Sequence, residues 1–384
     1  MANETAPDKE TFETFRNWRL NRAQYAKQWK QQSGGKIIGY FCTYVPEELI
    51  YAAGILPVRI LGSHETQNVT EPHIFAMFCP FCRDCLAQGL QGHFDYLDGI
   101  TISQSCLHIR QAYTSWQKHI PVDYSYYLPM PHHVQSPHAA PFLTKELEVF
   151  KASLEKWLGK KIDDQAIDDA VEVYNRNRQL MWQVYELRKG DCPPMIGEEA
   201  MEMVLSSQMV DKRDHNDALE TLLSRLSQRQ TQRPTGTRLM ILGSENDDIE
   251  FIRMVESCGA TFVVDDHCTG TRYFWNDVET DGDRLASIAN RYVKRVPCPT
   301  KDWPERTRVA HVIDLAKAYD VQGAIVVQQK FCDPHELDIP AVTKALNDAG
   351  IKTLFLEFDV TVPIGQFKVR VEAFLEMLQE DDLF

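Results

Sequence analysis

Three cysteines occupy positions at which a strand or loop gives way to the expected start of a helix. Cys106 follows the apolar run of residues 99–103. Cys332 follows the apolar run of residues 323–327, and Cys79 precedes a stretch that can open a helix. Thiolates are favoured at helix N-termini, where the backbone N–H groups carry partial positive charge. These thiols are therefore candidate ligands of an iron–sulfur centre.

The fold that must position these thiols is an open parallel sheet. Loops that leave the carboxyl ends of parallel strands converge on one crevice, so thiols far apart in the sequence can meet there. The alternative is that each free cysteine packs as a small hydrophobic residue. That alternative suits a single cysteine, but three cysteines at equivalent positions favour a cluster site.

Cations accompany the three cysteines. Arg83 and Arg110 each follow one of them by four residues, and Lys330 precedes the third by two. In a helix, residues four apart lie on the same face, one turn along. We therefore expect Arg83 and Arg110 to be cations close to the cluster, where they would tune its potential. The alternative is an exposed arginine on a helix.

Further cysteines leave the ligand set open. Cys79, Cys82 and Cys85 have the spacing with which a bacterial ferredoxin motif begins, but position 89 is glycine, so a complete ferredoxin module is not expected. No second Cys-x-x-Cys pair follows to close a zinc site. Cys82 and Cys85 are thus alternative ligands or helix-packing residues.

Composition excludes several protein classes. The chain has 384 residues, of which 43% are hydrophobic and 25% charged, with a net charge of −14 and ten cysteines. The negative charge argues against a general nucleic-acid partner. We see neither a signal peptide nor a membrane-spanning run, and so expect a soluble cytoplasmic protein. In that compartment the cysteines indicate metal or redox chemistry rather than disulfides.

The order of the expected elements predicts an α/β fold. Residues 36–41, 46–53 and 55–61 read as a strand–helix–strand unit, which implies a parallel pair. We predict two doubly wound parallel-sheet domains, flavodoxin-like or Rossmann-like, with an added helical region. The expected parts are an N-terminal helix (1–35), a first α/β domain with two cluster ligands (36–143), a helical region and linker (144–236) and a second α/β domain with the third ligand (237–384).

Local patterns predict individual helices and turns. Residues 10–32 have aromatic side chains at helical spacing, and Thr144 is an expected helix cap. Residues 265–268 (DDHC) follow a strand and could supply metal ligands, although loop capping and domain contact is the favoured interpretation. The turn after residues 238–242 lacks the glycine pattern of a dinucleotide site and the lysine of a P-loop, so we expect neither NAD nor ATP to bind this chain directly.

Longer stretches resemble one known family. They are residues 39–54 (GYFCTYVPEELIYAAG), residues 97–100 together with Cys106, residues 331–334 and the tail from residue 357 to residue 378. In these the chain resembles the 2-hydroxyacyl-CoA dehydratase/benzoyl-CoA reductase family, over essentially everything beyond the first helix. Residues 78–85 are most similar to the smaller core subunit of ATP-dependent benzoyl-CoA reductase.

The resemblance implies a cofactor, partners and a ligand set. A paralogous core subunit would pair with this chain, and each would carry an iron–sulfur cluster of 4Fe-4S type held by three cysteines, here Cys79, Cys106 and Cys332. A separate ATP-hydrolysing activator would deliver electrons from reduced ferredoxin. The fourth ligand stays open between Cys42, Cys82, Cys85, water and the acyl-CoA substrate.

The implied reaction is the two-electron reduction of the aromatic ring of benzoyl-CoA to a cyclohexadiene-carbonyl-CoA. One alternative is a subunit of a 2-hydroxyacyl-CoA dehydratase, and another is a non-catalytic, cluster-binding electron-relay subunit. His108, two residues after Cys106, is a candidate proton donor, with simple packing or hydrogen bonding as its alternative.

Overall fold

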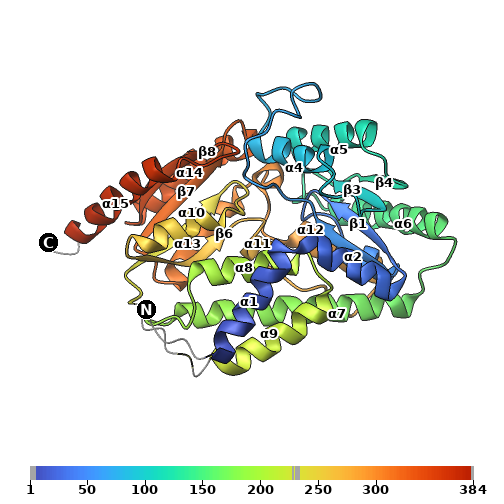
Figure 1. Cartoon of the computed structure of the whole chain (residues 1–384), viewed down its shortest axis with the longest axis horizontal. Coiled ribbons are helices and arrows are strands. Elements are labelled where there is room, and N and C mark those ends of the chain that lie inside the picture. The colour runs from blue at the N-terminus through green and yellow to red at the C-terminus, as the bar shows by residue number, and fades with distance from the viewer. Residues whose placement is uncertain (1–5, 227–228, 230–233, 382–384) are drawn as a thin grey trace.

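The computed structural model describes residues 6–226, 229 and 234–381. Two parallel sheets dominate it, one on each side of the molecule (Figure 1). The first, in the order β2-β1-β3-β4, is formed by β1 (Lys36–Tyr40), β2 (Ile55–Arg59), β3 (Gly99–Ser103) and β4 (Tyr124–Leu128). The second, in the order β6-β5-β7-β8, is formed by β5 (Thr237–Gly243), β6 (Ala260–Asp266), β7 (Gly323–Gln329) and β8 (Lys352–Phe358).

Both sheets are four-stranded and parallel throughout, and their strand orders are equivalent. Every residue of β2, β3, β5, β6 and β7 is buried. Burial on both faces is typical of parallel strands that helices cover on each side. The predicted α/β class with two doubly wound parallel sheets is confirmed.

Helices connect the strands in both halves, and one further helix follows the last strand of each sheet. Those of the first half are α3 (Glu47–Ala52), α4 (Pro80–Leu90), α5 (Leu107–His119) and α6 (Ala139–Leu158). Those of the second half are α10 (Ile249–Ser257), α11 (Thr271–Phe274), α12 (Arg284–Lys294), α13 (Thr307–Ala318), α14 (Asp333–Asp348) and α15 (Ile364–Asp381), with a short 3-10 helix, η2 (Pro299–Lys301). Of these helices, α6 follows β4 and α15 follows β8.

The remaining helices lie along one side of the molecule (Figure 1). They are α1 (Ala6–Leu20), α2 (Arg22–Ser33), α7 (Asp164–Glu186), η1 (Leu187–Lys189), α8 (Gly197–Ser207) and α9 (Lys212–Leu226). The single helix predicted over residues 10–32 is thus two helices that meet at Asn21. Among the described helices, none combines the length and apolar character needed to span a lipid bilayer.

Helix α6 begins earlier than its sequence suggests. It starts at Ala139, so Thr144 lies inside the helix and is not its cap. The Thr144 hydroxyl donates to the carbonyl oxygen of Ala140 at 2.9 Å, a bond typical of a threonine within a helix. The predicted domain boundaries stay predictions, and part of the predicted linker, residues 227–228 and 230–233, lies outside the described residues.

A helix from the second half of the sequence completes the first core. Helix α12, which lies between β6 and β7 in the chain, packs against α6. Its residues Ile288, Ala289 and Tyr292 share one buried cluster with Ile38 and Tyr40 of β1. The two halves are therefore interlocked rather than placed side by side.

A buried ion pair joins these parts. Glu48 of α3 has no exposed surface, and its carboxylate accepts hydrogen bonds from Arg178 of α7 and, at 2.9 Å, from the hydroxyl of Tyr292 on α12. Burial alone would raise the pKa of Glu48, but the adjacent Arg178 and Arg291 lower it overall. Glu48 is thus a charged group that holds three helices together.

Replacement of Arg178 by methionine should destabilise the protein severely. The change keeps the side-chain length but leaves the Glu48 charge buried beside one cation fewer, which typically costs about 3–5 kcal/mol of unfolding free energy. Chemical denaturation measures the loss. The matched control is Arg176→Met on the same helix, because Arg176 pairs with Glu220 at the surface and should cost no more than about 1 kcal/mol. Equal losses in both variants would contradict the assigned role of Glu48.

A second ion pair links the two halves near the carboxyl ends of the strands. His64, in the loop after β2, contacts Asp247, which precedes α10, at 2.6 Å. Asp84 of α4 holds this loop by accepting the backbone N–H groups of Ser63 and His64, both at 2.9 Å. Burial would lower the pKa of His64, but Asp247 raises it to about 9.

This pair should make stability depend on pH in a defined window. Because the pKa of His64 is raised above its ordinary value of 6.5, its contribution is complete below pH 6.5 and is lost as the pH rises toward about 9. We expect the difference in unfolding free energy between the wild type and His64→Gln to shrink over that range. Denaturant titrations at several pH values measure it, and a constant difference would contradict the expectation.

Candidate iron–sulfur site

Three helices begin at the three cysteines singled out in the sequence. Cys79 precedes the first residue of α4, Cys106 that of α5 and Cys332 that of α14, and each is the capping residue of its helix. The predicted helix starts are confirmed. Each thiol therefore lies at the positive end of a helix dipole, which favours the thiolate over the thiol.

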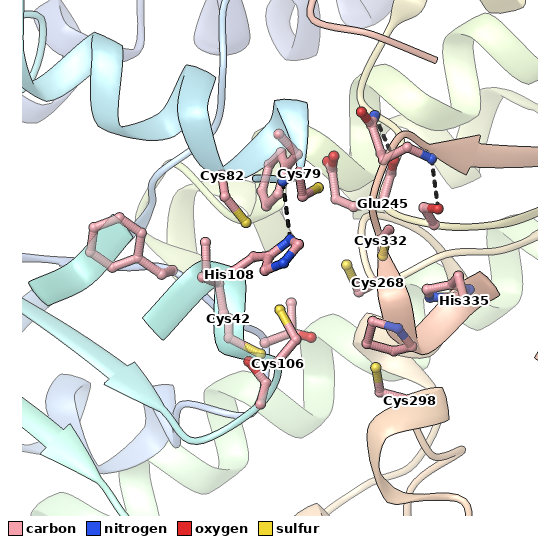
Figure 2. A pocket seen from close by; sticks show the side chains of 18 of the residues that line it. Cys42, Cys79, Cys82, Cys106, His108, Glu245, Cys268, Cys298, Cys332 and His335 are labelled. Atoms are coloured by element: carbon pink, nitrogen blue, oxygen red, sulfur yellow. Dashed lines mark hydrogen bonds between the residues drawn. The ribbon is translucent and has the colours of Figure 1, made fainter. Parts of the chain in front are cut away.

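These thiols line one cavity between the two sheets (Figure 2). The cavity is formed by residues that follow the carboxyl ends of strands in both sheets, such as Cys106 after β3 and Ser244 after β5. Seven cysteines line it: Cys42, Cys79, Cys82, Cys106, Cys268, Cys298 and Cys332.

Sheet topology explains why the cavity lies there. β1 lies between β2 and β3, and β5 lies between β6 and β7, so the connections leave each central strand in opposite directions. A crevice opens at such a switch point, outside the carboxyl ends of the strands. Here the crevices of both sheets contribute to the same cavity.

Four of the thiols form a connected series. The side chain of Cys79 interacts with those of Cys332 and Cys82, and Cys82 interacts in turn with Cys106. The interactions with Cys332 and Cys82 hold the pKa of Cys79 well below its usual range. Burial raises the pKa of Cys82. The three predicted ligands are therefore brought together, with Cys82 between Cys79 and Cys106.

The donor set distinguishes kinds of metal centre. Within the described ranges, no three or more His, Cys, Asp or Glu side chains form a group that could hold a metal ion. In an iron–sulfur cluster each thiolate binds a different iron, so the ligands surround a volume and need not converge on one point. Thiols spread around a cavity therefore suit a multi-iron cluster better than a single ion.

The cysteines considered as a fourth ligand differ in whether they line the cavity. Cys42 and Cys82 line the cavity. Cys85 is fully buried on α4, and its thiol lies 3.6 Å from the carbonyl oxygen of Ile60, so it packs within the first half of the structure. Cys85 is the helix-packing residue of the three.

His108 braces the loop that carries Cys79. Its Nδ1 accepts the backbone N–H of Cys79 at 3.0 Å, and its ring lies 4.7 Å from that of Phe78 (Figure 2). In the neutral ring this contact leaves the proton on Nε2. The geometry thus gives His108 a structural hydrogen bond, and its role as a proton donor stays a prediction.

The cations predicted to flank the ligands do not line the cavity, although the Nε of Arg83 donates to the carbonyl oxygen of Phe78, next to Cys79, at 3.0 Å. Arg83 and Lys330 both pair with Asp359, at 3.2 Å and 3.0 Å, and neither lines the cavity. Arg110 is exposed, which contradicts its prediction as a cation close to the cluster. The helical spacing was correct, but α5 directs Arg110 to its outer face because Ile109 and Ala112 occupy the buried one.

The cavity instead contains cations that the sequence analysis missed. They are Arg59, Arg272 and Arg295, all nearly fully buried. Arg59 is the last residue of β2, so its place at the carboxyl end of a strand was a usable signal. Arg295 instead donates to the carbonyl oxygen of Thr43 at 2.6 Å, a contact between distant segments that no local pattern reveals.

Arg59 is incompletely paired. It is 2% exposed, and its Nη2 lies 3.9 Å from the thiol of Cys268. Its Nε and Nη1 have no hydrogen-bond partner in the described part of the chain. Both carboxyl oxygens of Glu245, which also lines the cavity, likewise lack one there, and burial raises the pKa of that carboxyl well above its usual range. Buried polar groups are normally paired, so both side chains have bonding capacity for a ligand.

The acidic residues after β6 serve the protein framework. Asp266 pairs with Arg308 at 2.7 Å and with Arg272 at 3.3 Å, which fixes Arg272 in the cavity wall. Asp265 accepts the backbone N–H of Thr271 at 2.7 Å. The favoured interpretation, loop capping and domain contact, agrees with these contacts, whereas Cys268 of the same segment does line the cavity.

Comparison with known proteins assigns the chain to a family. Residues 42–378 match the family 2-hydroxyglutaryl-CoA dehydratase, D-component. The beta subunit of (R)-phenyllactyl-CoA dehydratase from Clostridium sporogenes is 27% identical, over 96% of this chain and 98% of the relative. A benzoyl-CoA reductase subunit from Thauera aromatica is also 27% identical, over 91% and 92%.

A further relative is the beta subunit of (R)-2-hydroxyglutaryl-CoA dehydratase from Acidaminococcus fermentans, 28% identical over 90% of this chain and 93% of the relative. All three relatives are named as subunits of enzymes that act on CoA thioesters. The resemblance found in the sequence is thereby confirmed. The chain belongs to the 2-hydroxyglutaryl-CoA dehydratase D-component family, which here includes 2-hydroxyacyl-CoA dehydratase and benzoyl-CoA reductase subunits.

Proposed function

We propose that this chain is the iron–sulfur subunit of an ATP-dependent benzoyl-CoA reductase. The observation that carries the proposal is the convergence, in one cavity between two sheets, of three thiols whose cysteines occupy helix N-cap positions. Cys79, Cys106 and Cys332 would hold a 4Fe-4S cluster, which supplies single electrons at low potential when bound. The chain would position the cluster and keep water away from it.

The residues around the cavity support that task. Phe41, Phe81 and Ile109 give it apolar walls, which lower the local dielectric constant and limit the access of water. The buried guanidinium of Arg59 provides N–H donors for sulfur or for an anionic ligand. The backbone N–H groups at the starts of α4, α5 and α14 add positive partial charge.

The reaction would be the two-electron reduction of the ring of benzoyl-CoA. The similarity to the benzoyl-CoA reductase subunit from Thauera aromatica supports this substrate. The second candidate is dehydration of a 2-hydroxyacyl-CoA, in which the electron is recycled, and the similarity to two dehydratase subunits favours it.

The proposed need for a separate activator rests on two motifs that the sequence does not contain. It contains neither a P-loop nor a dinucleotide fingerprint. ATP hydrolysis and electron delivery would therefore come from a separate activator supplied by reduced ferredoxin. A paralogous core subunit would complete the enzyme, in keeping with relatives that are named as subunits.

Iron content tests the ligand assignment. We expect Cys79→Ala, Cys106→Ala and Cys332→Ala, purified without oxygen, to contain markedly less iron per chain than the wild type, because each loses one thiolate ligand. Cys192→Ala is the matched control, since Cys192 is exposed and lies outside the cavity. Wild-type iron content in all three cavity variants would refute the assignment.

Electron stoichiometry distinguishes the candidate reactions. The core complex, assembled with its activator and supplied with ATP, should consume two electrons per product formed from benzoyl-CoA. A dehydratase would form product from a 2-hydroxyacyl-CoA with almost no net consumption. The chain alone should be inactive, so steady turnover by the single chain without ATP would contradict the proposal. If neither the chain nor the complex binds substrate, the chain is an electron-relay subunit.

A further inference from the structure

The cavity contains more thiols than one cluster needs. Cys79, Cys82, Cys106 and Cys332 form the connected series. The other three lining cysteines, Cys42, Cys268 and Cys298, are here called the second thiol set. They come from three separate segments, which follow β1, follow β6 and precede η2. Seven of the chain's ten cysteines thus face one cavity, which exceeds the four positions of a single 4Fe-4S cluster.

The members of the second thiol set share neighbours. Arg59 interacts electrostatically with Cys268 and Cys42. Lys301 interacts electrostatically with Cys42 and Cys298, and also with Cys106 of the first set, and Tyr44 interacts with Cys298 and Cys42. Cys42 therefore shares Arg59 with Cys268, and Lys301 and Tyr44 with Cys298. Figure 2 labels all three cysteines around the space next to Cys106.

Buried positive charge surrounds this set. Arg59 and Arg295 line the cavity, and Lys301 has no exposed surface. The Lys301 ammonium donates only to carbonyl oxygens among the contacts described, those of Gln104 at 2.9 Å and Pro131 at 3.0 Å. No carboxylate forms an ion pair with any of these three cations within the described ranges, and burial raises the pKa of Glu245, which interacts electrostatically with Arg59, well above its usual range. Buried cations without a counterion are costly, so the site is built for an anionic occupant.

Arg59 supplies the observation that points to a ligand. It is 2% exposed, and two of its nitrogen atoms, Nε and Nη1, lack a hydrogen-bond partner in the described part of the chain. Its third, Nη2, already contacts the thiol of Cys268. Thiolate and sulfide sulfur accept hydrogen bonds from such donors, and these bonds tune cluster potential.

Simple packing explains the second thiol set poorly. A cysteine that serves as a small hydrophobic residue is found among apolar neighbours. Cys42 and Cys298 do pack against a buried apolar cluster, but all three thiols are only partly buried, line the cavity and lie near Arg59 or Lys301.

We propose that Cys42, Cys268 and Cys298 bind a second iron–sulfur unit in the same cavity, next to the unit held by Cys79, Cys106 and Cys332. The inference rests on the proposed function in taking the first three thiols as cluster ligands. Arg59, Arg295 and Lys301 would offset the added negative charge. Two adjacent units would let one chain hold more than one electron at a time.

Iron and acid-labile sulfide per chain test this proposal. The wild type, reconstituted without oxygen, should contain about eight irons, twice the content of one 4Fe-4S cluster. Cys42→Ala, Cys268→Ala and Cys298→Ala should each lose about half of the iron. Cys192→Ala and Cys258→Ala, which change cysteines outside the cavity, should match the wild type.

Each outcome decides the question. A wild type with about four irons overturns the proposal, and so does wild-type iron content in all three variants of the second thiol set. Loss of all iron in these variants would still identify their thiols as ligands. If an alanine variant fails to fold, the wild-type count and the corresponding serine variant decide. A failure of the proposed function would give a different result: Cys79→Ala, Cys106→Ala and Cys332→Ala would then all keep their iron.

Discussion

The carboxylate of Glu48 is the interaction on which the cavity depends. It is buried completely in the segment that follows β1, and it binds Arg178 and Tyr292 from helices on either side. The same segment carries Thr43, which accepts a hydrogen bond from Arg295. Because a charge without water must keep its partners, this region has little freedom to open. The carboxyl edges of the two sheets are thereby fixed across a common space.

Charge inside the cavity is distributed unevenly, and this uneven distribution favours the binding of an anionic ligand there. The walls contribute helix N-termini and buried arginines, whereas the thiols and the carboxyls of Glu245 and Asp333 are the groups able to become negative. Arg272 is balanced by Asp266, but Arg59 is not balanced by any described carboxylate contact. The cavity wall therefore contains an arginine that is paired with a carboxylate, Arg272, and another that is not, Arg59.

Much of this arrangement was predictable, because strand ends and helix caps are local features. The strand-to-helix position of Cys106 and Cys332 identified both residues correctly as helix caps in the cavity wall. Features that depend on packing between distant segments were not predictable. Cys298 reaches the cavity only because α12 crosses to the first core, and Arg110 turns outward because the apolar face of α5 takes the inner side. A spacing of four residues defines a helix face but not the direction in which that face points.

The three thiols at helix N-cap positions come from segments that are widely separated along the chain, and this has a consequence for assembly. A cofactor bound by all of them would act as a covalent cross-link between the two halves, so its binding energy would add to the energy of folding. Loading would then have to accompany or follow the docking of the two sheets. Removal would require their separation, and the loaded form would resist proteases that readily attack the empty one.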